Sequence, residues 1–407
     1  MSASCPSTAV LSLERPQEAT WLQFVSHLDP KFGGIASLLP MFCAASDSEG
    51  VRCPVLGFCE SRERDNRWNN GNVPVTCVPA SRIAWTLGLR RRQRLKQAMR
   101  NADGIHIHGI WETHCAVGAK VAQACRTPYI LSAHGMLERW ALQSKRLKKA
   151  LYATLVETDN LRRASCLRAL THSEVNDYRR IGLTNSIAVV PSGVAIPPGA
   201  SGDAFLESYP HLRDKRLVVF LGRLHPKKGL SLLLRAWGRF AHQDAHLVIA
   251  GPDFDGTRSG LEKLAAELEI SDQVTFAGML SGAMKWSALA AAGIFVLPSY
   301  SEGFSVAVLE ALAMGVPVIV SRACNIPEVA EQGCGWMVEP EEAALANALE
   351  ESLLTSTPAL RSMGERGKAL VTSRYSWPVV GRQMAQVYRW VAGGPPPSDV
   401  PIFKMGR

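Results

Sequence analysis

The sequence from Arg216 to Val338 alternates between short apolar runs and longer amphipathic segments. The runs Arg216–Leu221 and His246–Ala250 have the length of strands, and Leu230–His242 between them carries apolar residues at helical spacing. The pattern then repeats toward Val338. Strands that alternate with helices in this regular way form a doubly wound parallel sheet. We therefore predict an α/β domain in this half of the chain.

The first half shows a weaker version of the same pattern. Gly104–Ile110 is predicted as a strand, Glu112–Cys125 as a helix and Pro128–Ala133 as the next strand, which together make a βαβ unit. Ligands of such sheets bind at the carboxyl ends of the strands. A segment rich in Pro, Gly and Ser then marks a surface linker. We predict a first domain over 1–195, a linker over 196–213, a second domain over 214–375, a terminal helix over 376–394 and a tail over 395–407.

Composition limits the partners and the compartment. The 407 residues carry a net charge of +9, which suits nucleic acid, an anionic membrane surface or anionic small molecules. The cysteines show no zinc spacing, so we expect reduced thiols, with a disulfide somewhere in the region from Cys43 to Cys77 as the open alternative. No apolar run is long enough to cross a membrane, and the N-terminus lacks a signal-peptide core. We expect a cytoplasmic protein, either soluble or bound to a membrane surface.

Two acidic residues stand out in the element from Pro298 to Pro317. Glu310 lies within a helix that is apolar nearly all round, where a carboxylate is costly unless it has a partner. Glu302 lies in the preceding loop, followed by Gly303 and a potential helix cap at Ser305. The amides at the start of this helix would favour an anion. A phosphate between two hydroxyl-binding carboxylates fits a sugar nucleotide. The alternative is that Glu310 pairs with a buried Arg and Glu302 is a solvated loop charge.

The pattern Glu302-Gly-Phe-Ser…Glu310-Ala-x-Ala-x-Gly-x-Pro317 resembles the E-x7-E motif of retaining GT-B glycosyltransferases of the glycogen synthase-like, family 4 group. This resemblance implies two Rossmann-like doubly wound domains that face each other across a cleft. It implies that the first domain binds the acceptor and the second the nucleotide-sugar. It also implies that the terminal helix, which starts near Tyr375-Ser-Trp377, packs back on the first domain.

A second motif, Gly222-Arg223-x4-Lys228-Gly229, places two cations after a strand of the second domain. Alone, these could be surface charges. With the acidic element downstream, they closely resemble the diphosphate-binding pair of the family, which stabilises the leaving group without a metal. The resemblance then implies that Glu302 binds hydroxyls of the donor sugar and Glu310 those of the ribose. Further donor contacts are implied for Gly303, Phe304 and Ser305, and for Met279 and Leu280 near the base.

The first domain contributes two further residues by resemblance. The Gly-Gly step at Gly34 is similar to the glycine-rich loop that faces the donor diphosphate and the acceptor, although any tight turn would use it. The Ala-His-Gly context of His134 resembles the histidine that contacts the donor sugar, with a hydrogen-bonded loop residue as the alternative. His106 and His108 are expected to be hydrogen-bonded core or loop residues. Ser192 stands where the family's P-N-G-V turn has Asn, which weakens any specific role for it.

The resulting hypothesis is a retaining hexosyltransferase that uses a nucleotide-sugar donor and a glycan or lipid-linked glycan acceptor. Family membership implies a role in cell-surface polysaccharide or lipopolysaccharide assembly, and a front-face reaction without cofactor or metal. We can nominate no carboxylate nucleophile. The basic segments 85–100 and 138–164 fit either solvated helix faces or docking on anionic lipid. Rival hypotheses are a sugar-nucleotide epimerase, an inactive sugar-nucleotide sensor, and a nucleic-acid-binding protein. The last lacks any recognisable reader motif.

Overall fold

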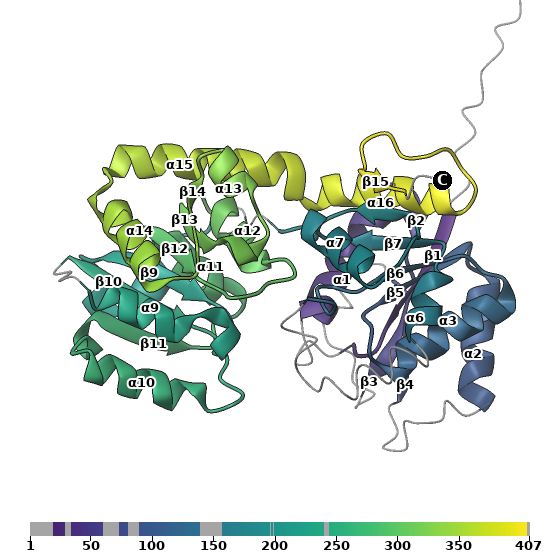
Figure 1. Cartoon of the computed structure of the whole chain (residues 1–407), viewed down its shortest axis with the longest axis horizontal. Helices are drawn as coiled ribbons and strands as arrows, with labels where there is room; N and C mark the ends of the chain where they lie inside the picture. The colour runs from purple at the N-terminus through teal and green to yellow at the C-terminus, as the bar shows by residue number, and fades with distance from the viewer. Residues whose placement is uncertain are drawn as a thin grey trace, which may run out of the picture.

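The computed structural model describes residues 19–28, 34–59, 73–79, 89–138, 157–195, 197, 199–239 and 244–404. It has two α/β domains side by side, joined along one edge by the last long helices (Figure 1). Each domain is built on its own sheet, nine-stranded in the first and six-stranded in the second. The prediction of two doubly wound parallel-sheet domains is confirmed.

The sheet of the first domain has the order β15-β8-β7-β6-β5-β1-β3-β4, with β2 paired to β1. All of its pairings are parallel except that of β15 with β8. Its strands are β1 (Ala19–Val25), β2 (Val51–Arg52), β3 (Val55–Cys59), β4 (Val75–Pro79), β5 (Gly104–His108), β6 (Tyr129–Ser132), β7 (Cys166–Ala169), β8 (Ile187–Val189) and β15 (Ile402–Phe403). Its helices are α1 (Gly34–Asp47), α2 (Leu89–Arg100), α3 (Thr113–Cys125), α6 (Thr158–Arg162) and α7 (His172–Arg180).

The sheet of the second domain has the order β11-β10-β9-β12-β13-β14 and is parallel throughout. The strands are β9 (Arg216–Leu221), β10 (Ala245–Ala250), β11 (Val274–Gly278), β12 (Ile294–Leu297), β13 (Val318–Ser321) and β14 (Gly335–Val338). The helices are α8 (Asp203–Ser208), α9 (Leu230–Trp237), α10 (Thr257–Glu267), α11 (Gly282–Ala291), α12 (Val306–Ala313), α13 (Glu328–Glu331), α14 (Glu342–Leu354) and α15 (Thr357–Leu370).

The chain passes between the domains twice, and the two passages lie together. Val194 forms a parallel β-bridge with Ser376, and the amide of Val194 donates to the carbonyl of Tyr375 at 2.8 Å. Helix α16 (Trp377–Val391) then packs against α1 of the first domain (Figure 1). Gly381 makes this close packing feasible, because a Cβ there would lie 2.3 Å from the carbonyl oxygen of Ala45. The terminal helix thus belongs physically to the first domain.

Two details differ from the expectations, and one expectation falls outside the described residues. Part of the expected tail forms β15, which adds an antiparallel strand at the edge of the first sheet. Cys77 is disulfide-bonded, so the expectation of reduced thiols is wrong at this position and the alternative of a disulfide involving this region holds, whereas Cys43 and Cys53 are free. Most arginine side chains of the basic segment 85–100, and most of segment 138–164, lie outside the described residues, so a membrane-docking surface stays a prediction. No helix in the described part of the chain has both the length and the apolar content to span a bilayer.

Candidate active site

The order of the second sheet reverses between β9 and β12, and the loops that follow these two strands meet there. The β9 loop carries Arg223 and ends in a short 3-10 turn, Pro226–Lys228. Gly229 follows in the left-handed conformation, with φ of 71°, and a Cβ at this position would lie 2.2 Å from the carbonyl oxygen of Pro298. Only glycine fits this contact. Gly229 therefore lets the cationic loop after β9 contact the acidic loop after β12. This contact lies at the point where doubly wound sheets bind ligands.

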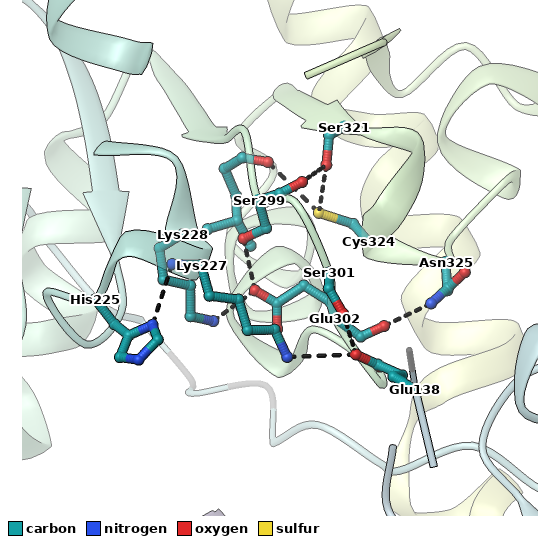
Figure 2. A network of polar contacts seen from close by, with 11 residues as sticks. Glu138, His225, Lys227, Lys228, Ser299, Ser301, Glu302, Ser321, Cys324 and Asn325 are labelled. Atoms are coloured by element: carbon teal, nitrogen blue, oxygen red, sulfur yellow. Dashed lines mark hydrogen bonds and ion pairs between the residues drawn. The ribbon is translucent and has the colours of Figure 1, made fainter. Parts of the chain in front are cut away.

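Lys228 and Glu302 form an ion pair in this contact (Figure 2). Lys228 Nζ lies 2.6 Å from Glu302 Oε1, and the Ser299 hydroxyl donates to the same oxygen at 2.6 Å. The backbone of Glu302 is also held, because its carbonyl accepts from Asn325 Nδ2 at 2.5 Å. Glu302 is 7% exposed, so the alternative of a solvated loop charge is wrong. Its carboxylate is instead fixed in one orientation beside a cation.

Glu310 has a different partner. It lies in α12, where Lys285 Nζ of the neighbouring α11 is 2.6 Å from Glu310 Oε1. The side chains of Glu310 and Lys285 are 15% and 25% exposed, so this pair borders solvent. The alternative of a buried Arg partner is therefore wrong. Ser305 occupies the cap position of α12 but makes no side-chain capping hydrogen bond, which corrects the predicted cap.

The first domain reaches the acidic loop through the turn after β6. His134 and Gly135 both have positive φ there, 52° and 75°. A Cβ on Gly135 would lie 2.6 Å from the Cα of Gly303, so the two glycines let the domains touch. Glu174 of α7 holds the turn, because its carboxylate accepts from the amides of Gly135 and Leu170 at 2.7 Å each. Burial raises the pKa of Glu174 to about 7.

Glu138, just after this turn, makes the polar contacts between the domains (Figure 2). Its Oε2 lies 3.4 Å from Lys227 Nζ and also accepts a hydrogen bond from the Ser301 hydroxyl. Glu138 is 9% exposed, and this burial raises the pKa of its carboxyl group. The sequence analysis did not identify Glu138, because its partners lie in the other domain and no motif marks it.

His134 is the outer end of a chain of buried polar groups. Its Nε2 lies 3.1 Å from His108 Nδ1, and His108 Nε2 lies 2.9 Å from Gln23 Oε1. Gln23 Nε2 in turn donates to the hydroxyl of Tyr388, on α16, at 3.1 Å. The same hydroxyl lies 2.7 Å from His106 Nδ1, as expected for a hydrogen-bonded core histidine.

Burial keeps these histidines neutral. Burial, with a smaller contribution from the Arg168 charge, lowers the pKa of His134 to about 3. Burial likewise lowers the pKa of His106 and His108 well below the usual value. His134 therefore faces the cleft as an uncharged hydrogen-bonding group with a fixed ring. The sequence predicted the position of His134 but not its support from Gln23 and Tyr388, which are separated by most of the chain.

The two domains enclose a cavity of ≈ 510 Å³. Most of the predicted site residues line it: Gly34, His134, Arg223, Lys228, Glu302, Gly303, Phe304 and Ser305. Met279 lines a second cavity of ≈ 190 Å³ at the carboxyl ends of β10 and β11, together with Asp253 and Arg258. Glu310 and Leu280 line neither of these two cavities. Of the predicted site residues, the cleft thus contains two cations, one carboxylate and one neutral histidine.

Comparison with protein families gives two matches that together span most of the chain. Residues 203–370 match the family model described as glycosyl transferases group 1. Residues 33–193 match a model described as a glycosyl transferase 4-like domain.

Curated relatives are similar at moderate identity. A GDP-mannose-dependent monoacylated alpha-(1-6)-phosphatidylinositol monomannoside mannosyltransferase of Corynebacterium glutamicum is 25% identical over 382 residues, which cover 88% of this chain and 94% of the relative. A phosphatidyl-myo-inositol mannosyltransferase of Mycobacterium tuberculosis is 33% identical over 213 residues, but these cover only 50% of this chain and 54% of the relative.

Solved structures are similar in fold. Sucrose-phosphate synthase from Thermosynechococcus elongatus superimposes with a TM-score of 0.72 at 20% identity, over 92% of this chain and 99% of that one. Anabaena HepE, solved in complex with UDP and glucose, gives a TM-score of 0.73 at 19% identity, over 91% of this chain and 99% of its own. At these identities the likeness concerns the GT-B fold alone.

Proposed function

Since this chain belongs to the group 1 glycosyltransferases and is a hexosyltransferase of GT-B fold, we propose that it transfers a sugar from a nucleotide donor to a glycan or lipid-linked glycan acceptor, with retention of configuration. The observation that supports this most is the convergence of Arg223, Lys228, Glu302 and His134 on one cavity between the domains. A cleft that both domains line can hold donor and acceptor in contact while excluding water.

In this proposal the two cations bind the donor diphosphate. Arg223 and Lys228 stand at the carboxyl end of β9, where the fixed charges can stabilise the negative charge that develops on the leaving group. Gly303, Phe304 and Ser305 line the same cavity at the start of α12, and their amides would add to the positive potential. The proposed reaction would need no metal or cofactor, because the two cations and the helix N-terminus would supply the charge stabilisation.

The carboxylates and the histidine would orient the sugar. Glu302 accepts hydrogen bonds in the described network and would exchange part of this for donor sugar hydroxyls. Neutral His134 would contact the same sugar from the first domain. Glu310 would bind the ribose hydroxyls, and the base would lie near Met279 and Leu280, where the smaller cavity opens. Retention would follow from a front-face reaction in which the leaving phosphate helps to deprotonate the acceptor.

The first test is a thermal-shift screen with UDP-, GDP-, ADP- and TDP-sugars. A ligand that binds only the folded state raises the melting temperature in proportion to the logarithm of its concentration over its dissociation constant. One nucleotide should stand out. A screen in which no nucleotide-sugar raises the melting temperature would overturn the donor assignment. Turnover of donor in the absence of any acceptor would favour the epimerase instead.

The wider role is part of the same proposal. Relatives named as phosphatidylinositol mannosyltransferases act on lipid-linked acceptors, and the net charge of +9 suits a cytoplasmic protein that works at an anionic membrane surface. These observations support our proposal of a role in the assembly of a cell-surface glycan, polysaccharide or lipopolysaccharide. Flotation of the full chain with anionic and with neutral vesicles would measure the membrane part of this role.

A further inference from the structure

Arg168 is a buried cation in the acceptor half of the cleft. It lies in β7, at the carboxyl end of the strand, and is 2% exposed. Arg168 nonetheless lines the interdomain cavity, as do Phe42, His134 and Ser192. A buried charge is unfavourable unless an opposite charge compensates it. The surroundings of this arginine therefore need an explanation.

The partners of Arg168 are neutral. Nε donates to the carbonyl of Val190 at 3.0 Å and Nη2 to the carbonyl of Pro191 at 2.8 Å. The guanidinium also lies over the ring of Phe42, 5.0 Å from its centroid. Among the described residues, no carboxylate pairs with Arg168 and no hydrogen bond engages Nη1.

Glu174 is the carboxylate with the strongest electrostatic effect on Arg168, but it forms hydrogen bonds to other groups. Both of its oxygens accept backbone amides, those of Gly135 and Leu170. Burial lowers the pKa of Arg168 only to about 10, so the guanidinium stays charged at neutral pH. The cavity wall of the first domain thus carries a positive charge that no described carboxylate contacts directly.

Ser192 adds a hydroxyl to the same wall. It follows Pro191, whose carbonyl Arg168 binds, and it is 7% exposed. Within the described part of the chain its hydroxyl makes no hydrogen bond. An arginine fork with a free donor and an adjacent hydroxyl is a set of groups that recognises the oxygens of a phosphate or carboxylate.

We propose that Arg168 and Ser192 form an anion subsite for the acceptor, so that the acceptor carries a phosphate or carboxylate group near the sugar that is extended. This inference rests on the proposed function, because it assumes that the first domain binds the acceptor. The subsite is separate from the donor cations, which come from the β9 loop of the other domain. The anionic group of the acceptor would balance the charge of Arg168. Its binding there would also fix the position of the acceptor relative to His134.

The test uses the full chain saturated with the nucleoside diphosphate that the thermal-shift screen selects, so that the donor phosphate site is occupied. Inorganic phosphate is then titrated by calorimetry. We expect one phosphate to bind with a millimolar dissociation constant. Arg168→Gln should weaken phosphate binding at least tenfold, whereas Arg162→Gln, which removes an exposed charge of the same domain, should leave it unchanged. Nucleoside diphosphate affinity should be equal in all three proteins.

A second variant covers the case in which Arg168→Gln does not fold. Ser192→Asp places a carboxylate beside the guanidinium without removing its bonds to the two carbonyls, and it should abolish phosphate binding. Glucose 6-phosphate and glucuronate should compete with phosphate in the parent protein, and glucose should not. Absence of phosphate binding to the parent, or parental phosphate affinity in folded Arg168→Gln or Ser192→Asp, overturns the subsite. Phosphate that anionic sugars fail to displace marks an effector site and overturns the acceptor assignment. Failure of every nucleotide to bind counts against the proposed function instead.

Discussion

Lys228 Nζ lies 2.6 Å from Glu302 Oε1, so a cation assigned to the donor phosphates and the carboxylate assigned to the donor sugar are partners of each other. The two side chains come from adjacent loops at the switch point of the second sheet, and they are 17% and 9% exposed. Donor binding must therefore divide this pair between two ligands, the diphosphate and the sugar. Disruption of the Lys228–Glu302 ion pair should therefore affect binding of the diphosphate and transfer of the sugar in different ways.

Glu302→Gln should separate binding of the diphosphate from sugar transfer. The substitution keeps the shape but removes the negative charge beside Lys228, so affinity for nucleoside diphosphate should rise about fivefold. Transfer should fall on the order of a hundredfold, because hydrogen bonds of the carboxylate to the sugar hydroxyls are weakened in the transition state. Calorimetry and an initial-rate assay measure the two effects. Glu267→Gln on the exposed face of α10 is the matched control. Parallel losses in both measurements would show that Glu302 only supports the fold.

Lys228→Ala should weaken nucleoside diphosphate binding by about tenfold to a hundredfold, as expected for loss of one charge-assisted contact in a poorly solvated site. The variant also leaves Glu302 without its cation, so the melting temperature should drop by a few degrees. Lys263→Ala removes an 80% exposed lysine of the same domain and serves as the control. Calorimetry decides the result, and unchanged affinity in a folded Lys228→Ala protein would dismiss the phosphate assignment.

Glu310→Gln should lower donor turnover far more than stability. The Lys285–Glu310 pair borders solvent, and such pairs contribute no more than about 1 kcal/mol. Loss of hydrogen bonds to the ribose would instead reduce nucleotide-sugar affinity at least about tenfold. Denaturant titration measures the change in stability, and calorimetry on the same protein measures the change in nucleotide-sugar affinity. Lys285→Ala breaks the same ion pair without touching the proposed ribose contact, so it should change stability by a similar amount and leave affinity nearly intact. A folded Glu310→Gln enzyme with parental kinetics would refute the ribose role.

The sequence was sufficient for those features that depend on local patterns. Apolar periodicity located the strands of the second domain, and Gly315, with φ of 75°, ends α12 where the pattern predicted. The loops that carry Arg223, Lys228 and Glu302 could be placed at one sheet edge because parallel strands end there together. The resemblance to a known family then supplied roles that spacing alone left open.

The contacts between distant segments could not be predicted in this way. Glu138 binds Lys227 and Ser301 across the domain interface, and no local pattern marks such a pairing. The support of His134 by Gln23 and Tyr388 depends on where α16 docks. Arg168 lies in an otherwise apolar strand, and its burial follows from the packing of α1 on the sheet. Even Lys285, the partner of Glu310, belongs to another helix.

The buried histidines should make the free energy of unfolding depend on pH. Because the pKa values of His106, His108 and His134 are lowered in the folded protein, each takes up a proton on unfolding when the pH falls below its ordinary value near 6.5. Their contribution to the free energy of unfolding is therefore present above pH 6.5 and decreases as the pH falls. Glu157 and Glu174, whose pKa values burial raises to about 7, act in the opposite direction over the same range.

The variant His108→Gln removes the proton that His108 takes up on unfolding, so its contribution can be measured separately. Between pH 5 and 6 the slope of unfolding free energy against pH should be smaller than in the parent by about 1.4 kcal/mol per pH unit, the value for one proton. Denaturant titrations at several pH values give this slope independently of any overall loss of stability. His172→Gln, which removes an exposed histidine of α7, should keep the parental slope. A parental slope in folded His108→Gln would mean that His108 is protonated in the native protein, and the neutral hydrogen-bonded chain from His134 to Tyr388 would then have to be abandoned.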